Sequence, residues 1–544
     1  MNQHPTTKAP LPAPDVAGEF PHGAGTLGSG IMFSRLSGFV RDAAIAALLG
    51  GTWTSDAFLV AFRLPNYMRH LLAEGAFAYT LVPSFMKREQ TEEDNGFARS
   101  IILLLAGVFA LAALAGILLR QPLASLLAPG LAARPEILQL ATVLLAICLP
   151  YFPLAAGAAA SASLLLARKQ FTAPAYSPLV FNLAMLAAAV AAFVLYGPGA
   201  TGTPYLLAAG VVVSGGAQWL YLSVPLAKAG FFRKKTPSPT PSARQTAMET
   251  GHEIRTTLRA MPATAFAASG GQVMLLAASV IASFTGEGSI SALYFAERLL
   301  EFPLGIISAA MGMSALTTLS DPRLNPAAGA CGNGAAMFRK ECASALRLTL
   351  FFALPAAAGA ACLAHPIIAL LYGRGAFEAN AINTTALALI AYAPGLPALA
   401  LSRPLLAALS ALGAARSGVK ATGVSLAVTV ILGSAVAPLH APYALAFAVS
   451  IAAWAYAAVL WRALSAKGCI DPVSRGWIFR SLTACAVMAV AVLGLQNTVD
   501  TPFWRVLVGV PCGVGIYLVA ARLCRMEEAA LCLQTLARIA RIGR

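Results

Sequence analysis

Charged side chains inside long apolar stretches are the residues of this sequence that could do chemistry. The segment S-R-L-S-G-F-V-R-D places Arg35, Arg41 and Asp42 in one such stretch. Two further stretches also hold polar and charged residues: Asp56, Arg63, Asn66, Arg69, His70 and Glu74 in one, and Glu297, Arg298 and Glu301 in the other. Because the planar fork of an arginine matches carboxylate and phosphate oxygens, these stretches predict ion pairs or the binding of an anion.

The stretches that position these charges belong to a chain with the composition of a membrane protein. Of its 544 residues, 58% are hydrophobic and 11% are charged, against roughly 25% charged in soluble domains. The mean hydropathy is +0.73 over the whole chain. Since a spanning helix needs about 20 apolar residues, these values predict many spans and exclude a soluble enzyme with a single anchor.

We therefore predict an all-α polytopic membrane protein with about fourteen transmembrane helices. The apolar stretches, separated by charges, prolines or glycines, are 30–50, 55–86, 99–119, 137–167, 174–196, 204–227, 257–284, 288–318, 342–371, 384–412, 419–438, 442–463, 477–495 and 503–523. Most of the Lys and Arg residues fall in alternate connections, which by the positive-inside rule places both termini in the cytoplasm. The same rule explains the net charge of +16 without any nucleic acid.

Polar segments divide the chain into predicted domains. Residues 1–25 are rich in Pro and Gly and predict a disordered cytoplasmic N-terminus, and residues 229–256 predict a basic cytoplasmic linker. The remaining segments are an N-lobe at 26–228 with six helices, a C-lobe at 257–465 with six helices, helices thirteen and fourteen at 475–525, and a basic cytoplasmic tail at 526–544. Two six-helix lobes that begin on the same side of a membrane predict a parallel repeat.

Two short matches are consistent with such a repeat. A-F-R-L at 61–64 corresponds to A-E-R-L at 296–299, and P-x-x-P at 150–153 corresponds to P-x-x-P at 394–397. Both pairs have similar spacing along the chain. They favour two six-helix lobes followed by a C-terminal helix pair.

Arg41, Arg69 and Arg298 are expected near mid-depth on three different helices. Each costs roughly 2.5 to 3.5 kcal/mol at the centre of a membrane helix, and three cations at one depth would repel each other in a dry core. They predict a water-filled cavity between the lobes and an anionic substrate, for which phosphate is the best chemical match. Asp42 and Glu301 can hold the guanidinium groups while the site is empty.

A structural role competes with this interpretation. An intramembrane arginine can also snorkel to an interface or join two helices through an ion pair. For Arg35, Arg63 and Glu74 the residue pattern leaves both roles open.

Metal and nucleotide chemistry have no support in the residue pattern. The nine cysteines contain no C-x-x-C pair, the six histidines contain no H-E-x-x-H motif, and most cysteines lie in apolar runs. A G-x-G-x-x-G match at 23–28 follows no predicted strand, so we interpret it as the entry to the first helix. We expect no metal site and no cofactor.

Three segments resemble a known family closely. S-R-L-S-G-F-V-R-D (34–42), S-D-A-F-L-V-A-F-R-L-P-N (55–66) and R-H-L-L-A-E-G-A-F (69–77) resemble the MurJ/MviN lipid II flippases of the multidrug/oligosaccharidyl-lipid/polysaccharide exporter superfamily. Y-F-A-E-R-L-L-E-F-P-L-G (294–305) resembles the eighth helix of these proteins. The resemblance implies a transporter, not an enzyme, that carries the lipid-linked peptidoglycan precursor to the outer leaflet of the bacterial inner membrane by alternating access.

The resemblance also implies roles for individual residues. By position, the substrate-binding residues are Arg35, Arg41, Asp42, Arg69 and Arg298, and the supporting or cavity-lining residues are Ala46, Asn66, Glu74 and Glu301. The sequence departs from the family after Pro397, where the usual lysine and aromatic segment are missing. Some relatives resemble sodium-coupled carriers, but residues 379–470 contain no Asp or Glu, so no sodium site is carried over.

Two other classes of protein compete with a lipid II flippase. A relative that exports another lipid-linked oligosaccharide would need the same cationic cavity, whereas a cationic-drug exporter would need carboxylates in place of arginines. A membrane glycosyl or acyl transferase would need a catalytic acid, base or metal set, which the pattern does not contain. The expected partners are lipid II and membrane lipids, and the resemblance is compatible with a monomer and with docking of cell-wall synthesis machinery.

Overall fold

The structure is a computed structural model that describes residues 21–72, 81, 94–229, 231, 270–319, 333–414, 416–471, 473–530 and 532–534. Within these ranges the chain forms helices joined by turns and short loops. The helices before the predicted linker are α1 Pro21–Leu49, α2 Trp53–Leu71, α4 Asp94–Leu118, α5 Arg120–Leu127, η2 Pro129–Ala133, α6 Pro135–Cys148, α7 Tyr151–Ala167, α8 Thr172–Leu195 and α9 Thr203–Lys228. We call this set the first bundle.

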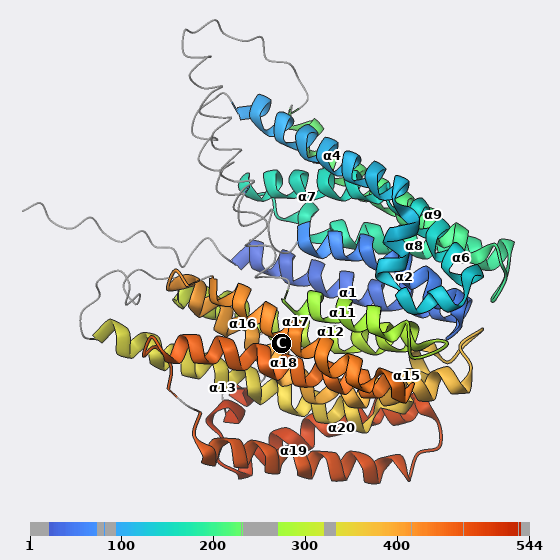
Figure 1. Cartoon of the computed structure of the whole chain (residues 1–544). Coiled ribbons are helices and arrows are strands. Elements are labelled where there is room, and N and C mark those ends of the chain that lie inside the picture. Colours follow the sequence, from blue (N-terminus) through green and yellow to red (C-terminus); the bar gives the residue numbers. More distant parts are fainter. Residues whose placement is uncertain are drawn as a thin grey trace, which may run out of the picture.

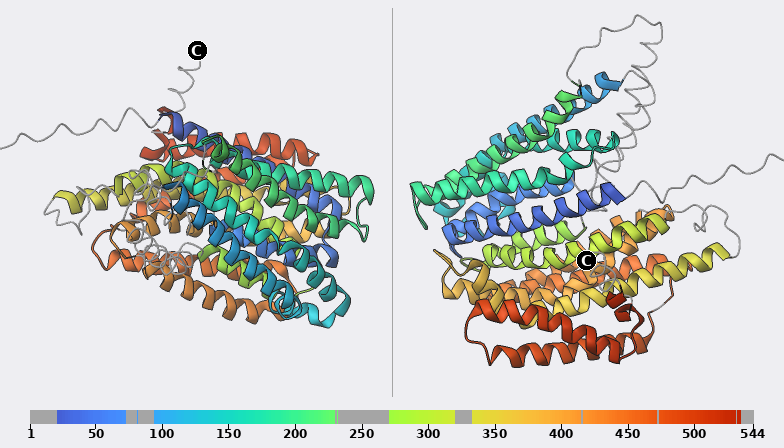
Figure 2. Two further views of the ribbon diagram at one scale, coloured as in Figure 1. Left: turned by 90° about the horizontal axis from the view of Figure 1, so that it is seen from above. Right: turned by 180° about the vertical axis from the view of Figure 1, so that it is seen from behind.

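The helices after the linker form two further groups. The second bundle comprises α11 Gly270–Ala282, α12 Ser289–Leu319, α13 Asn333–Cys362, α14 Ala364–Tyr372, α15 Ala379–Tyr392, η4 Ala393–Gly395, α16 Leu396–Ala411, α17 Arg416–Val436, η5 Ala437–Leu439 and α18 Pro442–Ser465. The last pair is α19 Arg475–Gln496 and α20 Pro502–Leu523. This pair packs on α13 and α14, on the side of the second bundle that faces away from the first (Figures 1 and 2).

The two bundles meet along a narrow set of helices. In the first bundle α1 packs mainly on α8, and α2 packs mainly on α6. From the second bundle, α12 contacts both α1 and α2, and the three helices lie at the centre of the molecule (Figure 1). These three helices carry the charged residues that the sequence singles out.

Many of the described helices can cross a membrane. Ten described helices or joined helix pairs are long and apolar enough by length and composition. The predicted spans around α1, α2, α11 and α12 are not in that set. Charged residues lie in α1, α2 and α12, and α11 is described only from Gly270. The outward faces carry large apolar side chains such as Leu118, Val194 and Val490, as expected for a surface that faces lipid. An all-helical membrane fold is thus confirmed, while the count of fourteen stays a prediction.

The structure corrects one detail of the sequence prediction and adds another. Helix α1 begins at Pro21, so residues 21–25 are helical and do not belong to a disordered terminus. Two predicted spans are each interrupted: α6 and α7 are separated at Leu149 and Pro150, and α15 and α16 are separated by the 3-10 turn Ala393–Gly395. Proline lacks the backbone N–H and clashes with the preceding turn, which explains the interruptions at Pro150 and Pro394.

Asp56, at the start of α2, joins the two bundles at one end of the molecule. Its side chain is fully buried. One carboxylate oxygen accepts hydrogen bonds from the backbone N–H (2.8 Å) and hydroxyl (2.6 Å) of Ser291, and the other accepts from the backbone N–H of Gly288 (2.8 Å). An acidic side chain that accepts from unpaired N–H groups stabilises a helix start, so Asp56 caps α12 of the opposite bundle.

Candidate functional site

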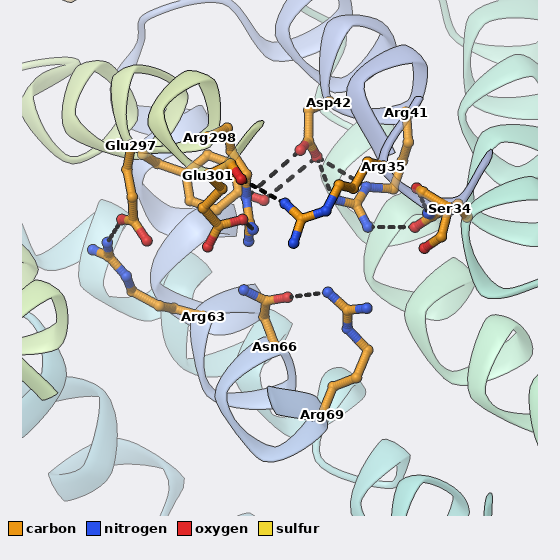
Figure 3. Close-up of polar contacts among 12 residues, drawn as sticks. Ser34, Arg35, Arg41, Asp42, Arg63, Asn66, Arg69, Glu297, Arg298 and Glu301 are labelled. Atoms are coloured by element: carbon orange, nitrogen blue, oxygen red, sulfur yellow. Dashed lines mark hydrogen bonds and ion pairs between the residues drawn. The ribbon is translucent and has the colours of Figure 1, made fainter. Parts of the chain in front are cut away.

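A carboxylate shared by two arginines lies where the bundles meet (Figure 3). Asp42 Oδ1 accepts hydrogen bonds from Arg41 Nε (2.9 Å) and Nη2 (2.7 Å), and Asp42 Oδ2 lies 3.6 Å from Nε of Arg298. Arg41 and Asp42 belong to α1, whereas Arg298 belongs to α12. One negative charge therefore holds two guanidinium groups that come from different bundles.

Arg298 has a second carboxylate partner. Glu301, one turn further along α12, lies 2.5 Å from Arg298 Nη1 and keeps a side-chain exposure of 26%, against 7% for Arg298. The guanidinium carbon of Arg298 also lies 4.9 Å from the ring centroid of Tyr294, whose hydroxyl donates to Asp42 Oδ1 at 3.4 Å. Tyr294 thus connects the shared carboxylate to Arg298, a role that the sequence analysis did not predict.

Asn182 on α8 holds Arg41 from the other side. Its Oδ1 accepts from Arg41 Nη1 at 2.8 Å, while its Nδ2 donates to the backbone oxygen of Ser34 (2.8 Å) and to the hydroxyl of Ser37 (3.0 Å). Because both donations fix the amide orientation, the oxygen must face Arg41. The sequence analysis missed Asn182, although an asparagine in the apolar stretch 174–196 is the kind of intramembrane polar residue that marks a site.

Substitutions at Asn182 should separate the stability of the fold from the binding of an anion at Arg41. Leucine should leave an Arg41 donor buried without an acceptor, which costs about 1 to 3 kcal/mol of stability. Aspartate should instead hold Arg41 more tightly and compete with an anionic ligand, so the binding of pyrophosphate to the purified protein should weaken while the melting temperature in detergent is maintained. Leu183→Ala on the exposed face of α8 is the control and should change neither. Pyrophosphate binding by Asn182→Asp at the parental affinity would contradict this role.

Arg69 of α2 approaches the same part of α8. Its Nη2 donates to Asn66 Oδ1 at 3.2 Å, and its guanidinium carbon lies 5.6 Å from the ring centroid of Phe181. Phe181 is the neighbour of Asn182, so α8 contacts the guanidinium groups of both Arg41 and Arg69. The sequence-predicted residues Arg41, Asn66 and Arg69 are therefore brought together by α1, α2 and α8, three helices of the first bundle (Figure 3).

Arg35 links the bundles by a different contact. Its Nη1 donates to the backbone oxygen of Glu301 at 2.5 Å, and its guanidinium occupies the space that a Cβ atom at Gly305 would need. Ala46 is fully buried, so it lines no open path in this conformation. Glu74 lies outside the described residues.

For Arg63 the structure favours the structural role. Its Nη2 donates to Glu297 Oε2 at 2.9 Å, and the side chains are 6% and 9% exposed. This buried ion pair joins α2 of the first bundle to α12 of the second, at some remove from Asp42 (Figure 3). It is the kind of pair that fixes two helices relative to each other.

The arrangement also corrects the expectation of an open cavity. The sequence predicts arginines that are solvated in water, but Arg41 and Arg298 are 2% and 7% exposed and are paired with carboxylates. Asp42 and Glu301 compensate the repulsion that would exclude such cations from a dry core. An anion can reach these guanidinium groups only after the pairs have opened. Among the described residues, no three His, Cys, Asp or Glu side chains are grouped as a metal site would need.

Comparison with known proteins gives one consistent family. The model of the lipid II flippase MurJ family matches residues 45–510. The probable lipid II flippase MurJ of Rhizobium meliloti (strain 1021) is 32% identical over 481 residues, which cover 86% of this chain and 85% of that protein. The lipid II flippase MurJ of Burkholderia cenocepacia is 28% identical over 469 residues, which cover 86% of this chain and 87% of that protein.

Solved structures show the same fold. A structure described as lipid II flippase MurJ in an inward closed conformation superimposes with a TM-score of 0.74 at 22% identity, covering 91% of this chain and 98% of that chain. A multidrug resistance transporter of the MATE family superimposes with a TM-score of 0.62 at 13% identity, covering 82% of this chain and 98% of that chain. With many apolar helices, these matches indicate a multi-pass protein of the bacterial inner membrane. The chain belongs to the lipid II flippase MurJ family, whose members are transporters and not enzymes.

Proposed function

We propose that this protein moves lipid II, the undecaprenyl-pyrophosphate-linked peptidoglycan precursor, from the cytoplasmic to the periplasmic leaflet by alternating access. The observation that carries this proposal is the carboxylate of Asp42, which holds Arg41 and Arg298 from opposite bundles. A pyrophosphate offers the same kind of oxygen acceptors as a carboxylate and more negative charge. It can therefore replace Asp42 as the partner of these arginines.

The exchange of partners would couple binding to movement. When a pyrophosphate takes Arg41 and Arg298, Asp42 no longer has to bridge α1 and α12. Asn182 continues to hold Arg41 on α8, and Asn66 continues to hold Arg69 on α2. The guanidinium groups would thus be positioned for the headgroup while the polyprenyl tail stays in lipid, and no covalent step is needed.

The proposal includes an orientation in the membrane. The loops rich in Lys and Arg and both termini would face the cytoplasm, as the positive-inside rule predicts. The end of the molecule at which Asp56 caps α12 would then face the periplasm, because it follows the first predicted span. We further propose two six-helix lobes with a C-terminal pair, a monomeric transporter, and docking of cell-wall synthesis proteins on it.

Complementation and reconstitution together test the substrate. We expect the gene to restore growth to bacteria depleted of their lipid II flippase, and the purified protein to flip lipid II in vesicles. An exporter of another lipid-linked oligosaccharide would share the arginine site, so the vesicles should also contain an undecaprenyl-pyrophosphate glycan without the peptide. Flipping of that glycan alone, with no growth rescue, would favour this alternative.

The membrane potential should drive transport without a sodium requirement. An anionic headgroup that moves outward across a membrane that is negative inside gains about 2.3 kcal/mol per charge per 100 mV. Flipping in vesicles should persist in sodium-free buffer and fall when the potential is collapsed. A strict sodium requirement at constant potential would contradict this, and would indicate a site built from hydroxyls such as Thr422, Ser425 and Thr429, which are buried on α17.

A further inference from the structure

Five glycines line the contact between the bundles at the end where Asp56 lies. Three come from the first bundle and face the second, namely Gly50, Gly51 and Gly130. Two come from the second bundle and face the first, namely Gly288 and Gly375. We call this set the glycine seam. It lies at the right-hand end of the molecule in Figure 1, where α1 ends, α2 and α12 begin and α15 starts.

The seam brings main chains into direct contact. A Cβ atom on Gly50, Gly130, Gly288 or Gly375 would overlap a backbone carbonyl of the opposite bundle, namely that of Ala376, Ser283, Gly51 or Ala47 respectively. A Cβ atom on Gly51 would lie 2.6 Å from the Cβ of Ala381 on α15. Two hydrogen bonds cross the same contact, from Ala376 N to the backbone oxygen of Ala47 (2.8 Å) and from Gly130 N to the hydroxyl of Ser283 (2.9 Å).

This contact differs from the arginine site in what holds it together. At the arginine site the bundles are joined by side chains that an anion can compete for, whereas at the seam, beside the hydrogen bonds of Asp56, the backbones of the two bundles are in direct contact. Backbone carbonyls cannot rotate away as the end of a long side chain can, so the bundles themselves must move apart to admit one extra carbon. The seam therefore makes the closed contact dependent on glycine.

We propose that the glycine seam is the outer gate of the transporter, and that the absence of side chains at these five positions allows the outer end to close. Any Cβ atom in the seam shifts the protein toward a state that is open at this end. The inference goes beyond the proposed substrate, since it concerns only how the bundles meet and needs no lipid II to be tested.

Substitutions at two of the five glycines test the added contact between the bundles without backbone strain. Gly50, Gly288 and Gly375 have φ of +65°, +70° and +60°, so any substitution there is strained whatever the neighbouring bundle does. Gly51 and Gly130 do not have positive φ, so alanine there adds the contact alone. These two positions are the informative ones.

Thiol labelling at Ser291 reports opening. Ser291 is fully buried behind the seam and bonds to Asp56 across the interface, so a cysteine there becomes accessible only when the bundles separate. In whole cells expressing Ser291→Cys without native cysteines, Gly51→Ala or Gly130→Ala should raise labelling by an impermeant maleimide about tenfold, the shift that overpacking of this size produces. Gly216→Ala, where a Cβ meets nothing within 4 Å, should leave labelling unchanged.

A paired substitution distinguishes the gate from a folding defect. Ala381→Gly removes the atom that a Cβ on Gly51 would meet, so Gly51→Ala with Ala381→Gly should return labelling to the parental rate. Gly197→Ala, which has φ of +80° and no neighbour within 4 Å, controls for strain and should not increase labelling. Unchanged labelling in both seam variants would overturn the proposal. The proposal would also be overturned if Gly51→Ala reduced the amount of folded protein and Ala381→Gly did not restore it. Gly51 would then be needed for packing within the first bundle and not for its contact with the second.

Discussion

Lysine in place of Arg298 is expected to reduce lipid II flipping by about tenfold or more while the transporter stays folded. A lysine keeps the positive charge next to Asp42 and Glu301, so neither carboxylate is left buried without a cation. It cannot reproduce the planar fork that bonds to two acceptors at once, and one charge-assisted hydrogen bond accounts for a loss of this size. Flipping in vesicles, growth rescue and melting in detergent measure the outcome.

Alanine at the same position should be a less informative variant. It leaves Asp42 with Arg41 as its remaining cation, and it leaves Glu301, 26% exposed, without the partner to which it lies closest. We therefore expect Arg298→Ala to lose transport and also to melt at a lower temperature, so that the two effects are mixed. Arg374→Lys, in the exposed turn between α14 and α15, is the matched control for the lysine variant and should flip at the parental rate. If Arg298→Lys also flips at that rate, the positive charge alone is sufficient and the fork has no role in binding.

The sequence was sufficient to identify three of the helices that carry the candidate site, namely α1, α2 and α12. Charges in apolar stretches are costly enough to stand out, and this is why Arg41, Asp42 and Arg298 could be assigned to a common site before their distances were known. The carboxylate partners were predictable too, because a buried guanidinium needs a counter-charge. In the structure Asp42 and Glu301 lie where that argument places them.

Other parts of the site depend on packing between distant segments. Asn182 reaches Arg41 only because α8 packs along α1, more than a hundred residues apart in the sequence, and no local pattern contains that information. Tyr294 contacts Asp42 for the same reason. The burial of Arg41 and Arg298 could not be predicted either, because the sequence positions of the charges do not show whether water or carboxylates surround the guanidinium groups. The breaks at Pro150 and Pro394 could have been predicted, because a proline stands at each.

Removing one partner of the ion pair between Arg63 and Glu297 is expected to lower the stability of the fold strongly. Glu297→Ala should leave the guanidinium of Arg63, whose side chain is 6% exposed, buried without its carboxylate, and should cost about 3 to 5 kcal/mol. Among the described residues Nη1 of Arg63 has no hydrogen-bond partner, so few acceptors lie nearby that could replace the carboxylate of Glu297. Folded protein in the membrane should fall sharply, whereas the exposed Glu378→Ala should have no effect. Membrane abundance and melting in detergent check this.

Replacing both Arg63 and Glu297 by apolar residues should restore the stability that Glu297→Ala loses. A buried ion pair exchanged for apolar side chains of similar volume is often neutral for stability, so Arg63→Met with Glu297→Met should restore membrane abundance and melting temperature. Because the pair lies apart from Asp42 and its role is to join α2 to α12, the double variant should also rescue growth. Arg41 and Arg298 differ from Arg63, because in the proposed function an anion replaces their carboxylate partners. A double variant that is folded but inactive would show that Arg63 and Glu297 take part in transport, and that the structural interpretation of this pair is wrong.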